Sequence, residues 1–235
     1  MSETAHNARM HSLSKNTPGL LLKDAGVCFT GVDLASYVSK PTPVKTLADD
    51  LRTALTDGSK GDIRCIGATR GGGNVNVETT WRDVEVDGKR GDQKGLTEID
   101  NVRVHLSTTL VEISAGNLEM ALAASDVETN AMGTVIRPCM QVADDDYIGH
   151  FVWIGQRGDG VLVAVDIFNA INKSGASVTY TDKGEATLAI DMYGHLDDLV
   201  NPQYAPCMIY ILENGAMTAM AMTLDGELEN ADTTT

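Results

Sequence analysis

Two segments within residues 63–114 constrain this chain most, because polar and apolar side chains alternate strictly along each. In residues 74–82 every second position, from Val75 to Trp81, is apolar or β-branched, and the same pattern returns in residues 101–109. A period of two is typical of a half-buried β-strand. Residues 84–100 hold three glycines and eight charged side chains, too polar for a core. The stretch therefore predicts a long antiparallel hairpin with one polar face and a projecting loop.

Short motifs flank these two strands. They are GATRGG (residues 67–72) before the first strand, RDVEVDG (residues 82–88) entering the loop and KGL (residues 94–96) leaving it. A second strand that runs into a short helix follows. In this order the motifs resemble the tail-tube, or major tail, proteins of long-tailed, non-contractile bacteriophages, and the resemblance covers roughly residues 60–200. It implies a single mainly β domain of sandwich or barrel type.

The composition limits the classes of function. A chain of 235 residues can form one sizeable core. Its formal net charge of −15 argues against binding nucleic acid through a basic patch, because phosphate binding requires clustered Lys and Arg. The first residues do not read as a secretory signal, and no apolar run is long enough to cross a bilayer. We expect synthesis in the cytoplasm and no membrane insertion.

Three regions are expected along the chain: a flexible N-terminal arm (1–18), a β domain (19–226) that contains the long loop (83–100), and a polar C-terminal tail (227–235). Helical spacing predicts two short helices at residues 44–55 and 114–124 and one helical turn at 169–173. Further strands are predicted at residues 20–30, 131–142, 147–156, 160–168, 177–180, 185–193, 208–212 and 216–224. The fold class is therefore mainly β, with about ten strands and two short flanking helices.

No catalytic arrangement is recognisable. The glycine-rich run at residues 70–73 lacks the Lys-Ser/Thr and the helix of a phosphate-binding loop, so it predicts a hairpin turn. His105 and Ser107 share a strand face, but their backbones lie about 7 Å apart and no orienting acid is apparent. Catalysis there would require hydrogen-bond reach. We expect a protein that is not an enzyme.

Metal and cofactor sites are also unsupported by the sequence. The five histidines are scattered, and the four cysteines form no CxxC pair, so buried free thiols are expected. Residues 144–146 are three consecutive aspartates without the ligand spacing of a calcium loop, which predicts a solvated turn. No cofactor is expected.

The resemblance implies a structural role in a virion tail that is assembled in the host bacterial cytoplasm. Six subunits would form a ring around a channel, and rings would stack into a tube that conducts DNA during ejection. Expected partners are further copies of the chain, the tape-measure, tail-tip and tail-terminator proteins, and DNA in transient, non-specific passage. The polar strand faces give the candidate channel-lining residues, which are Asn74, Asn76, Glu78, Thr80, Arg103, His105, Ser107, Glu185 and Asp191.

Family resemblance also implies that the loop reaches across the boundary between rings. Its charges are of both signs, and without the resemblance they would indicate only a solvated loop. The candidate residues for contact between rings are Asp83, Glu85, Asp87, Lys89, Arg90, Asp92 and Lys94.

Two alternatives stay open. The same fold could serve as the tube of a phage-derived injection machine, a tailocin or a type VI secretion-like system, which carries no DNA. A small enzyme or ligand-binding β-barrel would instead require convergent polar groups in a pocket, and the sequence offers none.

Overall fold

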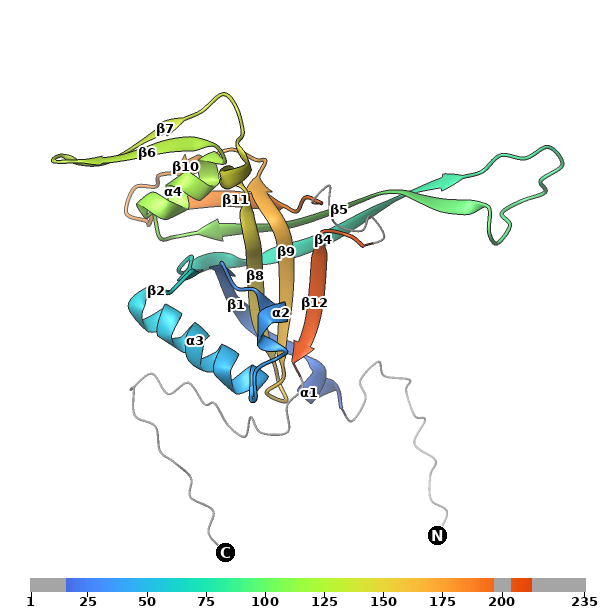
Figure 1. Cartoon of the computed structure of the whole chain (residues 1–235), viewed down its shortest axis with the longest axis horizontal. Helices are drawn as coiled ribbons and strands as arrows, with labels where there is room; N and C mark the ends of the chain where they lie inside the picture. The colour runs from blue at the N-terminus through green and yellow to red at the C-terminus, as the bar shows by residue number, and fades with distance from the viewer. Residues whose placement is uncertain (1–15, 197–203, 213–235) are drawn as a thin grey trace, which may run out of the picture.

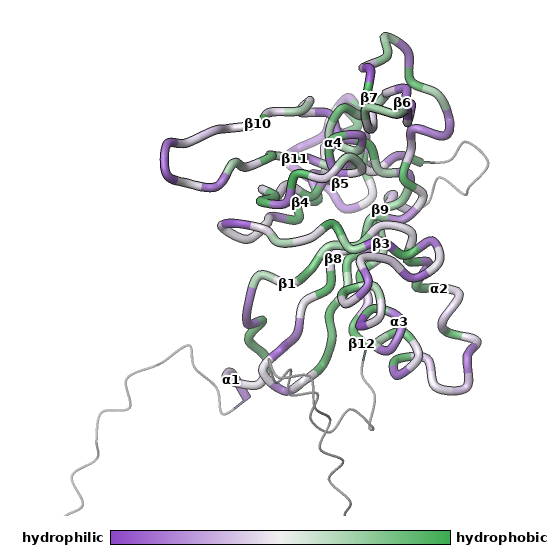
Figure 2. Tube along the Cα trace, turned by 90° about the vertical axis from the view of Figure 1, so that its left-hand side faces the viewer, coloured by the Kyte–Doolittle hydropathy of each residue, from purple (hydrophilic) through white to green (hydrophobic). Residues whose placement is uncertain are grey.

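Strands β8 (Ile148–Arg157) and β9 (Leu162–Asn172) form the centre of the protein in this computed structural model, which describes residues 16–196 and 204–212. They pair antiparallel across the turn at residues 158–161. Both strands are largely buried because the sheet is covered on its two faces. Figure 2 shows the hydrophobic stretches gathering where β1 and β8 cross the body, whereas the loop beyond β10 is hydrophilic.

The main sheet has ten strands, all paired antiparallel, in the order β2-β3-β1-β8-β9-β11-β5-β4, with β10 added to β11 and β12 added to β9. The sheet bends between β9 and β11, so β4, β5 and β11 run across the ends of the other strands (Figure 1). The bounds are β1 (Leu22–Thr30), β2 (Ser59–Lys60), β3 (Ile63–Cys65), β4 (Thr69–Asp83), β5 (Thr97–Leu110), β10 (Ser177–Thr179), β11 (Thr187–Tyr193) and β12 (Cys207–Leu212).

A separate two-stranded sheet, β6 (Ser125–Asn130) with β7 (Gly133–Pro138), extends from the body next to α4. The described helices are α1 (Thr17–Leu20), α2 (Leu34–Tyr37), α3 (Pro43–Asp57), α4 (Ala115–Leu122) and the 3-10 turn η1 (Asp144–Asp146). Helix α3 begins with Pro43, whose fixed φ suits a first turn, and ends at Gly58, whose φ of +82° is left-handed. Ser114 caps α4 by accepting a hydrogen bond from the Asn117 amide.

Two cores lie on opposite faces of the β1–β8–β9 sheet, because successive side chains of a strand point to opposite faces. Phe151 packs with residues of β5, β11 and α4, whereas its neighbour Val152 packs with α2 and α3. The protein is thus mainly β, with α2 and α3 over one face of this sheet and the bent β4–β5–β11 portion with α4 over the other.

Several sequence predictions are confirmed, among them the β4–β5 hairpin, the β8–β9 and β10–β11 hairpins, and the helices at residues 43–57 and 115–122. The hairpin strands are longer than predicted, which shortens the loop from residues 83–100 to residues 84–96. In β1, the register with β8 shifts between Lys23 and Val27.

Other predictions were wrong. The helical turn at residues 169–173 does not exist, because β9 continues to Asn172 through pairing with β8 and β11. Of the predicted strand at residues 131–142, only Gly133–Pro138 forms, and its partner β6 was missed. The count of two helices omitted α1 and α2, and α1 includes Thr17 and Pro18 from the predicted flexible arm.

Cysteine burial was predicted only in part. All four cysteines are free, but Cys28 is buried while Cys65 and Cys207 are half-buried and Cys139 is exposed. Residues 144–146 form the turn η1, in which the Asp146 side chain accepts a hydrogen bond from the Ala143 amide.

Some predictions fall outside the described residues: the arm up to residue 15, the strand at 216–224 and the tail at 227–235. Strand β12 pairs with β9 from Cys207↔Ile167 to Leu212↔Leu162. None of the described helices combines the length and apolar composition needed to cross a membrane.

The half-buried His150 on β8 and the buried Asp166 on β9 link the two central strands. Nδ1 of His150 lies 2.9 Å from Oδ2 of Asp166, which is 0% exposed. The hydrogen bond to Asp166 raises the pKa of His150, and burial raises the pKa of Asp166 because it disfavours the carboxylate. A second carboxylate nearby, that of Asp33, raises both pKa values further.

Both groups of this pair therefore hold protons more tightly in the folded protein, so its stability falls as pH rises. The contribution of His150 is complete below the ordinary histidine pKa of about 6.5 and is lost as pH rises through the higher folded value. We expect the melting temperature to fall between mildly acidic and alkaline pH, and Asp166→Asn to reduce that slope. Calorimetry of both proteins across this range measures the effect; equal slopes would contradict it.

Candidate functional site

The projecting hairpin, strands β4 and β5 with the loop between them, extends from the body well beyond its neighbours (Figure 1). Its base is held on one side, because β11 pairs with β5 from Tyr193↔His105 to Leu188↔Leu110. The Gly194 amide also donates a hydrogen bond to the Val104 carbonyl. Beyond Val104, β5 pairs only with β4, so the outer part is a two-stranded ribbon.

The polar face of the hairpin brings together eight of the nine residues predicted to line a channel. The register places Asn74 opposite Ser107, which in turn lies opposite Asp191 on β11. One step outward along the face, Asn76 is opposite His105, and Glu78 follows opposite Arg103. Thr80 continues the same face opposite Asn101. The alternation of the sequence thus corresponds to one continuous polar surface across three strands.

His105 is at the centre of this surface. Its Nδ1 lies 2.7 Å from Oδ1 of Asp191, and its ring stacks on that of Tyr193 with 4.7 Å between centroids. Its Nε2 lies 3.9 Å from Oε1 of Glu78, and the same oxygen accepts a hydrogen bond from Asn76. Desolvation and then the Asp191 carboxylate raise the pKa of Tyr193. These contacts fix the orientation of the polar side chains across the strands.

The structure supplies the acid that the sequence did not reveal beside His105. Asp191 is 86 residues away in the chain, so only the β5–β11 pairing brings it there. Within the described chain no hydrogen bond joins Ser107 to His105, whose second nitrogen faces Glu78 instead. Sequence reasoning missed Tyr193, although it occupies an alternate position of the predicted strand at 185–193.

Glu185 is the exception among the predicted channel residues. It lies in the turn before β11 rather than on the strand, and it pairs with Arg70. The hydrogen bond from Arg70 lowers the pKa of Glu185. The prediction that Glu185 lies on the polar face of a strand was wrong, because β11 begins at Thr187; its place in a channel stays a prediction.

The glycine-rich run is not the predicted hairpin turn. It lies within β4, where the register with β5 shifts between Thr69 and Gly73. Gly71 and Gly72 have φ of +78° and +76°, values that side chains rarely adopt. A β-bulge of this kind changes the strand direction at the base of the hairpin.

The apolar face of the hairpin is buried at its base and exposed beyond it. Val104 and Leu106 are buried in the core, but the outer positions Val77, Trp81 and Ile99 are 45%, 61% and 55% exposed. We call these three residues the apolar stripe. A second register shift, between Thr80 and Trp81, leaves Asp100 as an extra residue of β5 and places Trp81 opposite Ile99. Without this bulge, Asp100 would lie opposite Trp81.

Strand β4 is also an edge of the main sheet. Its other edge has no pairing partner in the described residues, although it runs from Thr69 to Asp83. A long exposed edge with an exposed apolar stripe is a surface on which a further chain can pair.

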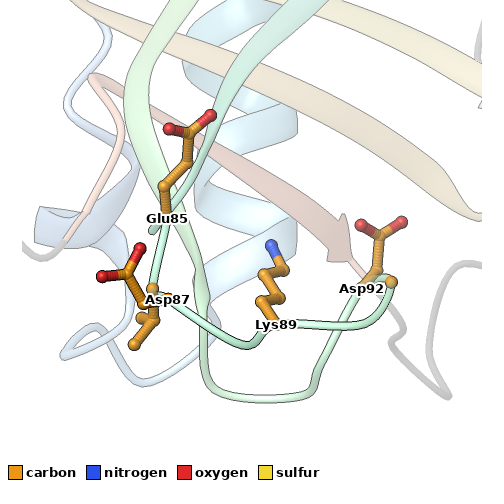
Figure 3. A pocket seen from close by; sticks show the side chains of 6 residues that line it. Glu85, Asp87, Lys89 and Asp92 are labelled. Atoms are coloured by element: carbon orange, nitrogen blue, oxygen red, sulfur yellow. The ribbon is translucent and has the colours of Figure 1, made fainter.

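The loop at residues 84–96 holds six of the seven residues predicted for contact between rings; the seventh, Asp83, ends β4 and accepts a hydrogen bond from Thr97 Oγ1. The Val84 amide closes the loop by donating to the Leu96 carbonyl over 2.7 Å. The loop surrounds an open hollow of about 490 Å³. Figure 3 shows the side chains of Glu85, Lys89 and Asp92 extending to the same side of the loop backbone. No ion pair in the described chain uses a side chain of residues 84–96.

A metal centre finds no support in the described part of the chain, where no group of three His, Cys, Asp or Glu side chains is placed to hold an ion. The hollow within the loop is open, unlike the enclosed apolar pocket of a typical small-molecule site. The prominent features of the protein are therefore surfaces: the polar face, the apolar stripe, the open edge and the loop.

No family model matches the sequence, and no curated protein does. The projecting hairpin and the motifs that flank it are therefore the features from which a function can be inferred.

Proposed function

We propose that this protein is the tube subunit of a phage tail, in which copies form rings around a channel and the rings stack. The observation that carries the proposal is the apolar stripe on the outer half of the hairpin, next to the open edge of β4. A second chain would bury such a surface, and a strand edge provides the backbone groups to pair with it. On this proposal the protein is structural and has no catalytic role.

The symmetry of the contact follows from the shape of the surface. The stripe and the edge belong to one end of the molecule, so each copy would offer a different surface to the copies on either side. Such heterologous contacts close into a ring when the rotation allows. The family that the motifs resemble forms rings of six. Tape-measure, tail-tip and tail-terminator proteins are then the expected partners at the inside and the ends of the tube.

In such a ring the polar face of the hairpin would line the channel, with Glu78 and Asp191 as its carboxylates. Six copies of a chain with net charge −15 carry −90 per ring. A channel of this sign repels phosphate and lets DNA pass without binding. The β-branched and apolar residues on the opposite face of the same strands would form part of the tube wall.

The first test is negative-stain electron microscopy of the concentrated protein together with its Trp81→Ser variant. Rings or hollow tubes are expected for the unmodified protein. Burial of a large side chain contributes about 2 kcal/mol, so the variant should require a roughly thirtyfold higher concentration to assemble. Tyr180→Ser is the matched control, because Tyr180 is also an exposed aromatic side chain, 80% exposed, but lies outside the hairpin.

Two results would contradict the proposal. One is a protein that sediments as a monomer at every concentration, even after addition of a tail-tip or tape-measure partner. The other is an equal loss of assembly in the Tyr180 and Trp81 variants, which would remove the role of the apolar stripe.

A further inference from the structure

A groove on the body lies between α4, the turn η1 and the ends of strands β8 and β9. Its volume is about 350 Å³. The floor is apolar and includes Met120, Ile148 and Ile171, whereas the rim carries three carboxylates. We call it the carboxylate groove. Its rim residues are Glu119, Asp145, Asp146 and Arg64.

The rim has an excess of negative charge. The single cation, Arg64, is held in place: its Nη1 donates a hydrogen bond to Asn117 Oδ1 over 2.8 Å. Gly116 lies against this guanidinium, since a Cβ at that position would be 3.1 Å from Nη1. By contrast, within the described chain neither Glu119 nor Asp145 takes part in a side-chain hydrogen bond or ion pair.

This chemistry fits a basic side chain. An apolar floor can contact the aliphatic part of a lysine or arginine, and carboxylates at the rim can accept hydrogen bonds from its charged end. Such charge-assisted contacts are strongest where the groove excludes water.

The described part of the chain also carries a group of basic side chains without ion-pair partners. We call Lys89, Arg90 and Lys94, in the loop of the projecting hairpin, the basic tip. None of them forms an ion pair within the described chain. The carboxylate of Asp92 extends to the same side as Lys89 (Figure 3), so the tip offers an anion for Arg64 as well as cations for the rim.

The basic tip and the carboxylate groove lie far apart in one molecule. The loop is at one end of the long axis, while α4, which forms one wall of the groove, lies toward the other end (Figure 1). A tip therefore cannot reach the groove of its own chain. A head-to-tail neighbour brings the two together and repeats the contact along a stack.

We propose that the carboxylate groove of one copy receives the basic tip of the next copy. The proposal rests on the proposed tube function and names the surface that the loop contacts. It commits to a second copy of this chain, because the charges of the tip and of the rim are complementary.

Carbodiimide cross-linking of the unmodified protein tests this contact, since the reagent joins a lysine amine to a carboxylate only where the two touch. Tubes assembled from a mixture of isotopically light and heavy chains should give mixed cross-links between Lys89 or Lys94 and Glu119, Asp145 or Asp146. Dilute, unassembled protein should give at least about tenfold less, because docking raises the effective concentration of the two groups. Tubes without these cross-links would overturn the proposal and leave the tube function standing, whereas the absence of any assembly would overturn both.

A charge exchange gives a second measurement. Asp145→Lys should raise the concentration needed for tube growth at least about tenfold, because it removes one charge-assisted contact. Adding Lys89→Asp to the same chain should restore growth. Asp49→Lys, at an exposed position of α3, is the matched control and should have no effect. Failure of the second change to restore growth would overturn the proposed pairing.

Discussion

Deleting residues 89–93 from the hairpin loop is expected to leave a protein that folds as before and no longer grows into tubes. The deleted residues contribute little to the fold. Of their groups, only the Lys89 amide and the Gln93 carbonyl form hydrogen bonds that the structure records, both within the loop. The bond from the Val84 amide to the Leu96 carbonyl, which closes the loop, remains. The free energy of unfolding should therefore change by less than about 1 kcal/mol.

Assembly should respond differently, because the deletion removes both Lys89 and Arg90 and shortens the reach of the loop. Thermal unfolding and electron microscopy of the same preparation separate the two effects. A control of full length, with Lys89, Arg90 and Asp92 changed to Ser, distinguishes loss of charge from loss of reach. Normal tubes from the shortened protein would refute a role for the loop between rings.

The second large effect is expected from Glu78→Lys, which should leave tube assembly intact and slow the passage of DNA. Glu78 is on the polar face, where its side chain is 54% exposed and lies opposite Arg103. Its contacts to Asn76 and His105 are at the surface, so the cost to folding should stay below about 1 kcal/mol. In the proposed ring of six, the change would place six ammonium groups around the channel.

Those groups would attract the DNA phosphates and release counterions. DNA should therefore move more slowly through the channel, and its rate of passage should depend more strongly on salt concentration. We expect ejection from particles built with the variant to be about tenfold slower at low salt, and purified tubes to retain added DNA. Asp49→Lys is again the control, since it makes the same change of charge on α3. Ejection at the normal rate, or equal retention by the control, would count against a channel-facing Glu78.

Much of the hairpin could be predicted from local sequence, because polar and apolar residues alternate along a strand that has one solvent-exposed face. The polar residues from Asn74 to Thr80 share one face as the alternation indicates. The bulge at Asp100 was not visible in this way. Regular alternation places Asp100 on the apolar face and Ile99 on the polar one, and only the pairing of Trp81 with Ile99 shows that the period is interrupted.

The predictions that failed depended on distant parts of the chain. The residues next to Asn172 in the sequence do not indicate that its side chain is buried, yet the residue is only 3% exposed. Its Nδ2 donates hydrogen bonds to the carbonyls of Ala121 and Gly175, and its Oδ1 accepts one from the Asp191 amide. Asn172 and Ala121 are 51 residues apart in the sequence. Such contacts keep β9 extended where a helical turn was expected. Asp191 beside His105 likewise depends on sheet order. Local propensity cannot supply such information, because tertiary pairing overrides it.

The outer part of the hairpin has a mechanical consequence. From Thr97 to Arg103 the strand β5 has a neighbour on one side only, over a length of roughly 24 Å. A two-stranded ribbon twists and bends far more easily than a wide sheet. Links of this kind between stiff bodies would give a long filament its compliance: each junction could deflect slightly while the bodies keep their shape, so that a tail many rings long would curve smoothly under load instead of breaking.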